Sequence, residues 1–270
     1  MAIAVMRERL REPRRGRSLL PASLTVLCVL VLLEAISRVG LLPTHDFPPP
    51  SDVVMALGKE SADGLFWKAV LDTLVGWFLS LAIAAALAIP VGIAIGVSGS
   101  LQNATQAILE FLRPVPSVAL IPVAILVYGT GLESKVFLGV WASVWPILIQ
   151  TIYGVRDVDR VGIDTAQAFQ VNKLRQLWRV VLPSALPYVA TGLRISSVIA
   201  LTLTVTAELV IGSPGLGRLI SDAQYGGAVA SMYAVIFATG LLGVVLTFSL
   251  ARVERQLLRW HPSHRSKAVK

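Results

Sequence analysis

The distribution of charge constrains this chain more than any other feature of its sequence. Between Asp72 and Glu110 no residue is charged, and further long apolar runs follow. Only 15% of the residues are charged and 55% are hydrophobic, whereas soluble domains carry about a quarter charged residues. Most helices of such a chain have no side that faces water. The sequence therefore excludes an ordinary soluble enzyme, a disordered chain and a fibrous protein, and it predicts a polytopic membrane protein.

The apolar runs predict an all-α fold with about six transmembrane helices, because a helix needs roughly 20 apolar residues to cross the hydrocarbon. The first helix is expected within residues 19–41, and the others at residues 73–97, 115–132, 136–153, 188–211 and 229–250. The Gly- and Ser-containing stretch after residue 97 is expected to be a loop over residues 98–104. The predicted organisation is a tail at 1–18, the first helix, an external connection with a short surface helix at 42–64, a transmembrane core at 65–251 that includes a loop at 154–187, and a tail at 252–270.

The basic residues indicate the orientation in the membrane. They concentrate in the two tails and in the 154–187 loop, which a six-span chain places on one side: Arg7, Arg9, Arg11, Arg14, Arg15, Arg17, Arg156, Arg160, Lys173, Arg175, Arg179, Arg252, Arg255, Arg259, Arg265, Lys267 and Lys270. Because Lys and Arg are enriched in cytoplasmic loops, both termini are expected in the cytoplasm of a multi-pass inner-membrane protein. The formal net charge of +8 is therefore interpreted as topology rather than as a nucleic-acid patch.

The 154–187 loop has a helical pattern of its own. Its apolar residues, from Ile163 to Trp178, suggest a short amphipathic helix, a turn near Val171, and a basic second helix. Two interpretations stay open on this pattern alone. The segment could lie on the membrane surface with its basic side chains at lipid headgroups, or it could dock on a cytoplasmic partner.

The residues of this loop resemble the motif of binding-protein-dependent ABC importer permeases. That motif runs Glu-Ala-Ala, three residues, Gly, nine residues, Ile, one residue, Leu-Pro, and the spacing here matches without a gap. The matching positions are Asp164, Thr165, Ala166, Gln170, Val180, Leu182 and Pro183. Gln170 stands where the family has Gly. If that Gly makes the turn between two short helices, then Gln170 adopts a strained turn or the turn moves to Asn172.

The resemblance extends over about residues 45–260. It points to the nitrate, sulfonate, taurine and bicarbonate branch of these permeases, which have the type I importer fold. The segments that carry it are Pro48–Val54, Phe111–Pro122, Gly154–Asp159, Leu186–Arg194 and Gly215–Gly217.

This resemblance implies a function and a set of partners. The chain is expected to be a permease subunit rather than an enzyme, and to form a homodimer with two cytoplasmic ATPase subunits and an external substrate-binding protein. ATP and Mg would bind the ATPase, since this chain has no phosphate-binding Gly-rich motif, and no cofactor is expected here. The 164–183 segment would couple to the ATPase, with Phe169, Leu174 and Leu177 as apolar anchors.

Charged residues within the spans are further candidates. A carboxylate in a span suggests function by default, so Glu208, with Thr204 on the same helix, is a candidate translocation-pathway residue; the alternatives are a structural ion pair and a position near the external interface. Arg113, Pro114 and Pro116 are expected to have a structural role at the start of a broken helix, and Arg194 to reach toward the membrane surface. The tryptophans, including Trp145, are expected to pack or to anchor at the interface. No His/Cys spacing predicts a metal site. A secondary transporter or channel without an ATPase, and a membrane enzyme, are the competing functions.

Overall fold

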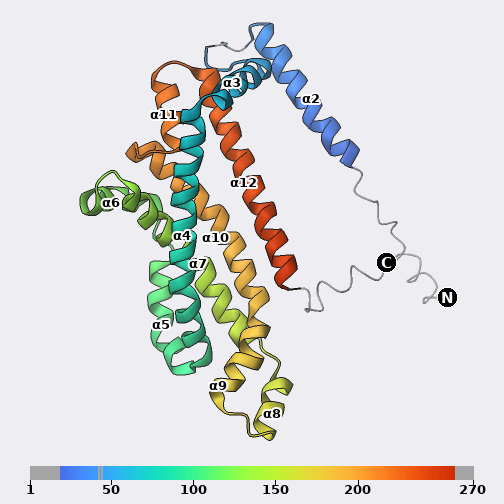
Figure 1. Ribbon diagram of the computed structural model, residues 1–270, viewed down its shortest axis with the longest axis vertical. Coiled ribbons are helices and arrows are strands. Elements are labelled where there is room, and N and C mark those ends of the chain that lie inside the picture. The colour runs from blue at the N-terminus through green and yellow to red at the C-terminus, as the bar shows by residue number, and fades with distance from the viewer. Residues whose placement is uncertain (1–18, 42, 44, 259–270) are drawn as a thin grey trace, which may run out of the picture. The chain divides into compact units, whose positions relative to one another are not determined.

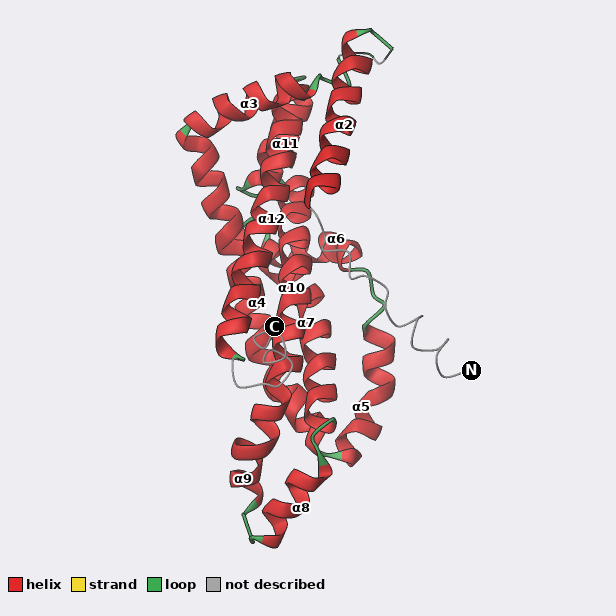
Figure 2. Ribbon diagram, turned by 90° about the vertical axis from the view of Figure 1, so that its right-hand side faces the viewer, coloured by secondary structure: helices red, strands yellow, loops and turns green. Residues whose placement is uncertain are grey.

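The computed structural model describes residues 19–41, 43 and 45–258, and all regular elements in this part are helical (Figures 1 and 2). The basic tails predicted at 1–18 and, from residue 259 on, at the C-terminus lie outside the described residues. The chain divides into two units, Met1–Met55 and Ala56–Lys270. The helices are α2 (Leu19–Arg38), α3 (Pro50–Ala62), α4 (Gly64–Val97), α5 (Gly99–Leu112), α6 (Ile121–Tyr128), α7 (Leu132–Arg156), α8 (Arg160–Ala168), α9 (Lys173–Gln176), α10 (Leu182–Ile211), α11 (Leu216–Tyr225) and α12 (Val229–Leu257).

Four helical segments of the described chain are long and apolar enough to cross a membrane. They are α4, α7, the continuous helical stretch Lys173–Ile211, and α12, and a fifth span results if α5 and the short helices after it count as one. The all-helical, multi-span architecture predicted from the sequence is therefore confirmed. The count of six and the side on which the termini lie stay predictions.

The third predicted span is not one straight helix. Residues 115–132 were expected to cross as a unit, but the stretch Ser117–Tyr128, which begins as a 3₁₀ turn, counts as a span only together with α5, and the two are bent by 81°. Pro114 and Pro116 lie in the break, and a proline lacks the amide hydrogen that would continue the helix. Arg113 is the C-terminal cap of α5, so it ends one helix rather than starting the next.

The predicted loop at residues 98–104 is also wrong, because α5 begins there. Ser98 ends α4 and starts α5 at once, since its hydroxyl accepts a hydrogen bond from the Leu101 amide at 3.3 Å. A serine in this position satisfies one of the free amide groups of a helix N-terminus. The expected break after residue 97 is thus one residue long, and an amphipathic helix follows it.

Close packing of α4, α7 and α10 forms the core of the second unit. A β-carbon at Gly92 of α4 would lie 2.7 Å from the Thr151 β-carbon of α7, so only glycine allows this approach. Between α7 and α10, the Ser196 hydroxyl donates to the Ser143 carbonyl at 2.7 Å, and the Ser143 hydroxyl donates back to the Ser196 carbonyl at 3.3 Å. Small residues and interhelical hydroxyl bonds are the usual means of helix association in a bilayer, where apolar burial drives little.

In the first unit, Glu34 connects α2 to the start of α3. Its carboxylate pairs with Arg38 Nε at 2.6 Å and accepts hydrogen bonds from the Ser51 amide at 3.0 Å and the Ser51 hydroxyl at 2.8 Å. α3 begins at Pro50, as the preference of proline for the first helical turn allows. The carboxylate of Glu34, the single charge within the apolar run of α2, is therefore paired with Arg38 and Ser51 of the same unit.

Candidate coupling segment and buried ion pair

The loop between α7 and α10 folds into two short helices with a turn between them. The Asp159 carboxylate caps α8 by accepting from the Val161 amide at 2.9 Å. The Asn172 side chain caps α9 by accepting from the Arg175 amide at 2.8 Å. A π-helical turn, Leu177–Val181, then leads into α10, where Pro183 occupies the first turn. Both caps follow from residue types that favour helix N-termini.

Gln170 makes the turn in the left-handed conformation. Its φ is 54°, and no other non-glycine residue of the described chain has a positive φ. The Val171 amide donates to the Ala166 carbonyl at 2.9 Å and the Gln170 amide to the Gln167 carbonyl at 2.8 Å, which is the Schellman pattern that glycine usually completes. Of the two alternatives for this turn, the strained one is therefore confirmed: Gln170 adopts the geometry expected of the family's Gly, and Asn172 serves as a cap.

Three large apolar side chains of this segment are exposed. Phe169 is 80% exposed, Leu174 64% and Trp178 66%; we call these three residues the coupling face. Leu177, expected as an anchor, instead packs against the buried cluster that contains Val155 and Val181. Leu177 is only partly buried, so its role as an anchor stays a prediction, and Trp178, which the sequence did not single out as an anchor, is exposed beside it.

The remaining motif residues divide between core and surface. Ala166 is buried, Val180 packs on the same cluster as Leu177, and Leu182 and Pro183 are partly buried. Asp164 and Thr165 are exposed, with the Thr165 hydroxyl bonded to the Val161 carbonyl at 2.7 Å. The motif therefore has an inner side that holds the segment on α7 and α10 and an outer side that is free.

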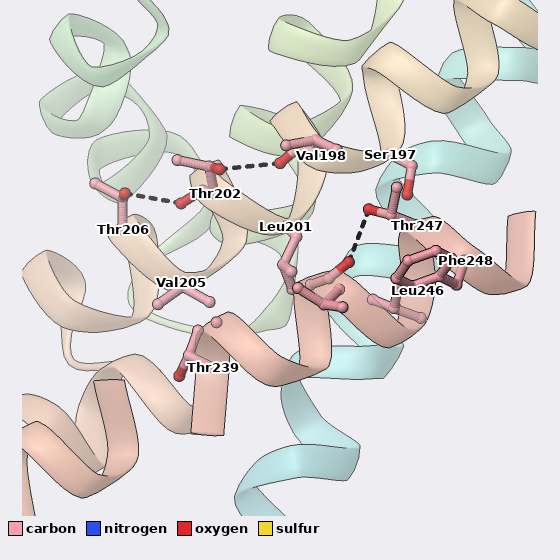
Figure 3. A pocket seen from close by; sticks show the side chains of 13 residues that line it. Ser197, Val198, Leu201, Thr202, Val205, Thr206, Thr239, Leu246, Thr247 and Phe248 are labelled. Atoms are coloured by element: carbon pink, nitrogen blue, oxygen red, sulfur yellow. Dashed lines mark hydrogen bonds between the residues drawn. The ribbon is translucent and has the colours of Figure 1, made fainter. Parts of the chain in front are cut away.

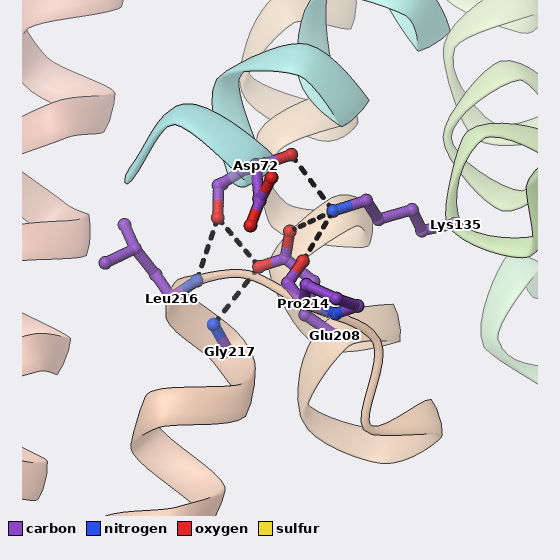
Figure 4. Close-up of polar contacts among 7 residues, drawn as sticks. Asp72, Lys135, Glu208, Pro214, Leu216 and Gly217 are labelled. Carbon is purple, nitrogen blue, oxygen red and sulfur yellow. Dashed lines mark hydrogen bonds and ion pairs between the residues drawn. The ribbon is translucent and has the colours of Figure 1, made fainter. Parts of the chain in front are cut away.

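A buried ion pair joins α7 to α10 (Figure 4). Lys135 Nζ lies 2.8 Å from Glu208 Oε1, and the two side chains are 2% and 0% exposed. The ammonium group also donates to the Asp72 carbonyl at 3.0 Å and to the Pro214 carbonyl at 2.8 Å. Its three hydrogens thus have three acceptors, as a buried ammonium requires.

The second carboxylate oxygen of Glu208 extends the same network. Oε2 accepts from the Thr73 hydroxyl at 2.8 Å and from the Gly217 amide at 3.1 Å. The Thr73 hydroxyl in turn accepts from the Leu216 amide at 2.9 Å. The network therefore holds α4, α7, α10 and the start of α11 together, and we call Lys135, Glu208 and Thr73 the buried network.

Glycines around the network leave room for the carboxylate. Gly215 has φ 150°, a conformation that favours glycine, and any β-carbon there would overlap the Glu208 carboxylate. A β-carbon at Gly217 would likewise lie 2.3 Å from the Val205 carbonyl oxygen of α10 and 2.7 Å from the Glu208 β-carbon. The Gly-Leu-Gly sequence that begins α11 is explained by this packing.

Sequence reasoning identified Glu208 but missed Lys135. The two residues are 73 positions apart in the chain, and the sequence analysis assigned Lys135 no role. A signal was nevertheless present, because a buried carboxylate near one end of a span needs a cation at the same depth. Arg194, the single basic residue of α10, pairs instead with Glu254 of α12.

Glu208 and Thr204, the tentative pathway residues, are both fully buried within the chain. The groove of about 520 Å³ between α10 and α12 (Figure 3) has neither of them in its lining. Thr202, Thr206 and Thr247 line it, but their hydroxyls donate to carbonyls of their own helices at 2.8–2.9 Å. The groove therefore presents an apolar surface. Among the described residues no cluster of His, Cys, Asp and Glu could hold a metal ion.

The fold has several helices that are long and apolar enough to span a membrane, as in a multi-pass helical membrane protein. The solved inward-facing structure of the MetNI methionine ABC transporter matches with a TM-score of 0.63 at 21% identity, over 71% of this chain and 95% of the other, which supports the fold. The family described as binding-protein-dependent transport system inner membrane component matches residues 88–259. The chain belongs to this family.

Two relatives show the similarity over longer stretches. The chain is 32% identical over 242 residues to the taurine transport system permease protein TauC of Escherichia coli, covering 88% of each protein. It is 32% identical over 197 residues to the bicarbonate transport system permease protein CmpB of Synechococcus elongatus, covering 73% of this chain and 70% of that protein.

Proposed function

We propose that this chain is the permease subunit of an ATP-driven importer and that its coupling face docks on a cytoplasmic ATPase subunit. The observation that carries the proposal is the coupling face itself. Phe169, Leu174 and Trp178 are large, apolar and exposed, and they stand on a segment whose backbone is fixed by two caps and a Schellman turn. Apolar anchors on short helices fit a groove of a partner protein.

The geometry of the segment favours docking over simple lipid contact. Gln170 holds a left-handed conformation that is strained for a residue with a β-carbon, and its side chain is exposed. Strain of this kind is retained where a function depends on the shape of the backbone. Docking on a partner whose surface fits the angle between α8 and α9 would be such a function.

The complete assembly that we propose has two copies of this chain, two ATPase subunits that bind ATP and Mg, and an external binding protein that delivers the solute. Both termini and the coupling face would be cytoplasmic. Since the relatives named above carry taurine and bicarbonate, both of which bear an oxyanion group, we propose a small oxyanion-bearing solute for this chain.

Co-purification tests the proposal. The tagged chain is extracted from its native membrane in mild detergent, and the co-eluting proteins are identified by mass spectrometry. An ATPase subunit whose turnover responds to the permease supports the importer. A chain that elutes alone and catalyses solute flux in ATP-free vesicles would establish the alternative, a secondary transporter or channel.

A further inference from the structure

A hydrogen bond crosses the base of the coupling segment, the loop at residues 157–181 between α7 and α10. The Tyr188 hydroxyl of α10 donates to the Asp157 carboxylate. Asp157 is the residue that ends α7, and its amide donates to the Tyr153 carbonyl at 2.9 Å. Two residues further along the chain, Asp159 caps α8. The bond therefore joins α10 to the point at which α7 ends and the coupling segment begins.

A close approach of α7 and α10 brings Tyr188 to this point. A β-carbon at Gly154 would lie 2.6 Å from the Tyr188 β-carbon and 3.1 Å from the Ala185 carbonyl oxygen, so only glycine allows the two helices to pack this closely. Gly154 and Asp157 are three positions apart and therefore lie on the same face of α7. The tyrosine crosses α7 over the glycine and reaches the carboxylate about one turn further on.

Apolar contacts at the same junction hold the helices together without fixing their angle. The buried cluster that joins them consists of Val155, Val158, Val181 and Ala185. Apolar burial has no preferred direction, whereas a hydrogen bond weakens steeply as its angle departs from linear. A hydrogen bond to a carboxylate is also about twice as strong as one between neutral groups. The bond between Tyr188 and Asp157 therefore supplies the directional contact at this junction.

α10 connects this junction to the buried network. Tyr188 and Glu208 are 20 positions apart in α10, which is about 30 Å along a helix. At the far end, Glu208 binds Lys135 of α7 and Thr73 of α4. A displacement of the coupling segment would reach this end of α10 only if the segment and the helix move as one unit.

We propose that Tyr188 and Asp157 are positioning residues for transport, whose hydrogen bond fixes the coupling segment to α10. Movement of the ATPase then reaches the membrane helices instead of bending the loop at its base. The inference rests on the proposed importer function and identifies the contact through which this chain follows its ATPase. Both residues lie outside the coupling face, so binding of the ATPase does not depend on them.

The first measurement uses the full chain in nanodiscs, with its single cysteine replaced by Cys28→Ser. Spin labels are attached at Gln167→Cys on α8 and Val198→Cys on α10, two exposed positions. Labelled chain is diluted with unlabelled chain, so that double electron–electron resonance records distances within one chain. Tyr188→Phe, which removes only the hydroxyl, should broaden the distance distribution. An unchanged width overturns the proposal.

Three further variants separate the hydrogen bond from general loosening. Asp157→Ala should broaden the distribution as Tyr188→Phe does, whereas Asp157→Asn keeps an acceptor oxygen and should restore most of the native width. Tyr153→Phe is the matched control, because Tyr153 lines the same cleft of about 460 Å³ as Tyr188 and its hydroxyl has no partner within the described chain. Broadening by Tyr153→Phe equal to that by Tyr188→Phe would overturn the assignment.

The second measurement uses the complex with the ATPase that co-purification yields. A spin label at Tyr225→Cys on α11, which is 86% exposed, reports the distance between the two copies before and after trapping with Mg-ATP and vanadate. Tyr188→Phe should retain ATPase binding and ATP hydrolysis but lose most of the shift that trapping causes. A shift of native size in this variant shows that the present inference alone is wrong, whereas failure of any ATPase to co-purify shows that the proposed function is wrong.

Discussion

The coupling face and the buried network show opposite treatments of polar and apolar groups. In the buried network every donor of Lys135 and both oxygens of Glu208 have partners within the chain. On the coupling face, the side chains of Phe169, Leu174 and Trp178 are mostly exposed and are not covered by other residues of the described chain. The network is thus complete within one chain, while the coupling face leaves apolar surface that the proposed ATPase partner would cover.

This difference predicts that substitutions in the two regions cause different defects. A change in the buried network leaves an uncompensated group in the interior, so it should act on folding. A change on the coupling face removes a contact that the isolated chain never makes, so it should act on assembly. The predictions below test this division, from the largest expected effect to the smallest.

Lys135→Met is expected to lower stability most. It leaves the Glu208 carboxylate buried without its cation, and breaking one side of a buried ion pair costs about 3–5 kcal/mol. The measurement is the thermal unfolding midpoint in detergent, followed by size-exclusion chromatography with fluorescence detection.

The control for this change is Arg218→Gln, which removes the exposed i,i+4 pair with Asp222 on α11. Exposed pairs contribute about 0–1 kcal/mol, so its midpoint should stay close to that of the native chain. The double variant Lys135→Met, Glu208→Leu should recover part of the loss, since no charge is then left unpaired. A native midpoint for Lys135→Met alone would show that the ion pair does not stabilise the fold.

Leu177→Asp tests the boundary between the two regions. Leu177 belongs to the motif but packs on the cluster of Val155 and Val181, so the aspartate would be forced into an apolar contact. A loss of roughly 2 kcal/mol is expected from burying a group without partners. If the variant were as stable as the native chain and lost only the ATPase, Leu177 would belong to the coupling face after all.

Phe169→Asp and Leu174→Asp should abolish co-purification of the ATPase while leaving the unfolding midpoint unchanged. Anchors of a protein interface typically contribute about 2 kcal/mol or more each, and neither side chain has a packing role within the described chain. The matched control is Tyr225→Asp on α11, another exposed aromatic residue, which should retain the ATPase. Retention by both coupling-face variants would exclude this segment as the docking site.

The sequence predicted the spans better than it predicted what joins them. Charge-free runs gave α4, α7 and α12 because hydropathy reports burial in the bilayer directly. Pro114 and Pro116 indicated a break before the third predicted span, but hydropathy alone did not predict the angle of the bend. The start of α5 was missed because Ser98 ends one helix and caps the next, which composition does not distinguish from a loop.

Only those features of the candidate sites that depend on neighbouring residues in the sequence could be predicted. Motif spacing left the turn open between Gln170 and Asn172, and apolar periodicity predicted the two short helices α8 and α9. The packing of Leu177 on the cluster of Val155 and Val181 is a tertiary contact that no local pattern indicates. The partner of Glu208 depended on a contact across 73 residues, which one sequence does not contain.

Gln170→Gly is expected to have the smallest effect, and it has the opposite sign. Relief of the left-handed strain gains about 1–2 kcal/mol, and the greater freedom of glycine in the unfolded chain returns about 0.5–1 kcal/mol of it. The net result is a slightly higher unfolding midpoint with the ATPase retained. Gln170→Ala, which keeps a β-carbon, should show no such gain. Equal midpoints for the two variants would mean that Gln170 stores no strain, and the difference between a strained coupling segment and a satisfied buried network would then lie in exposure alone.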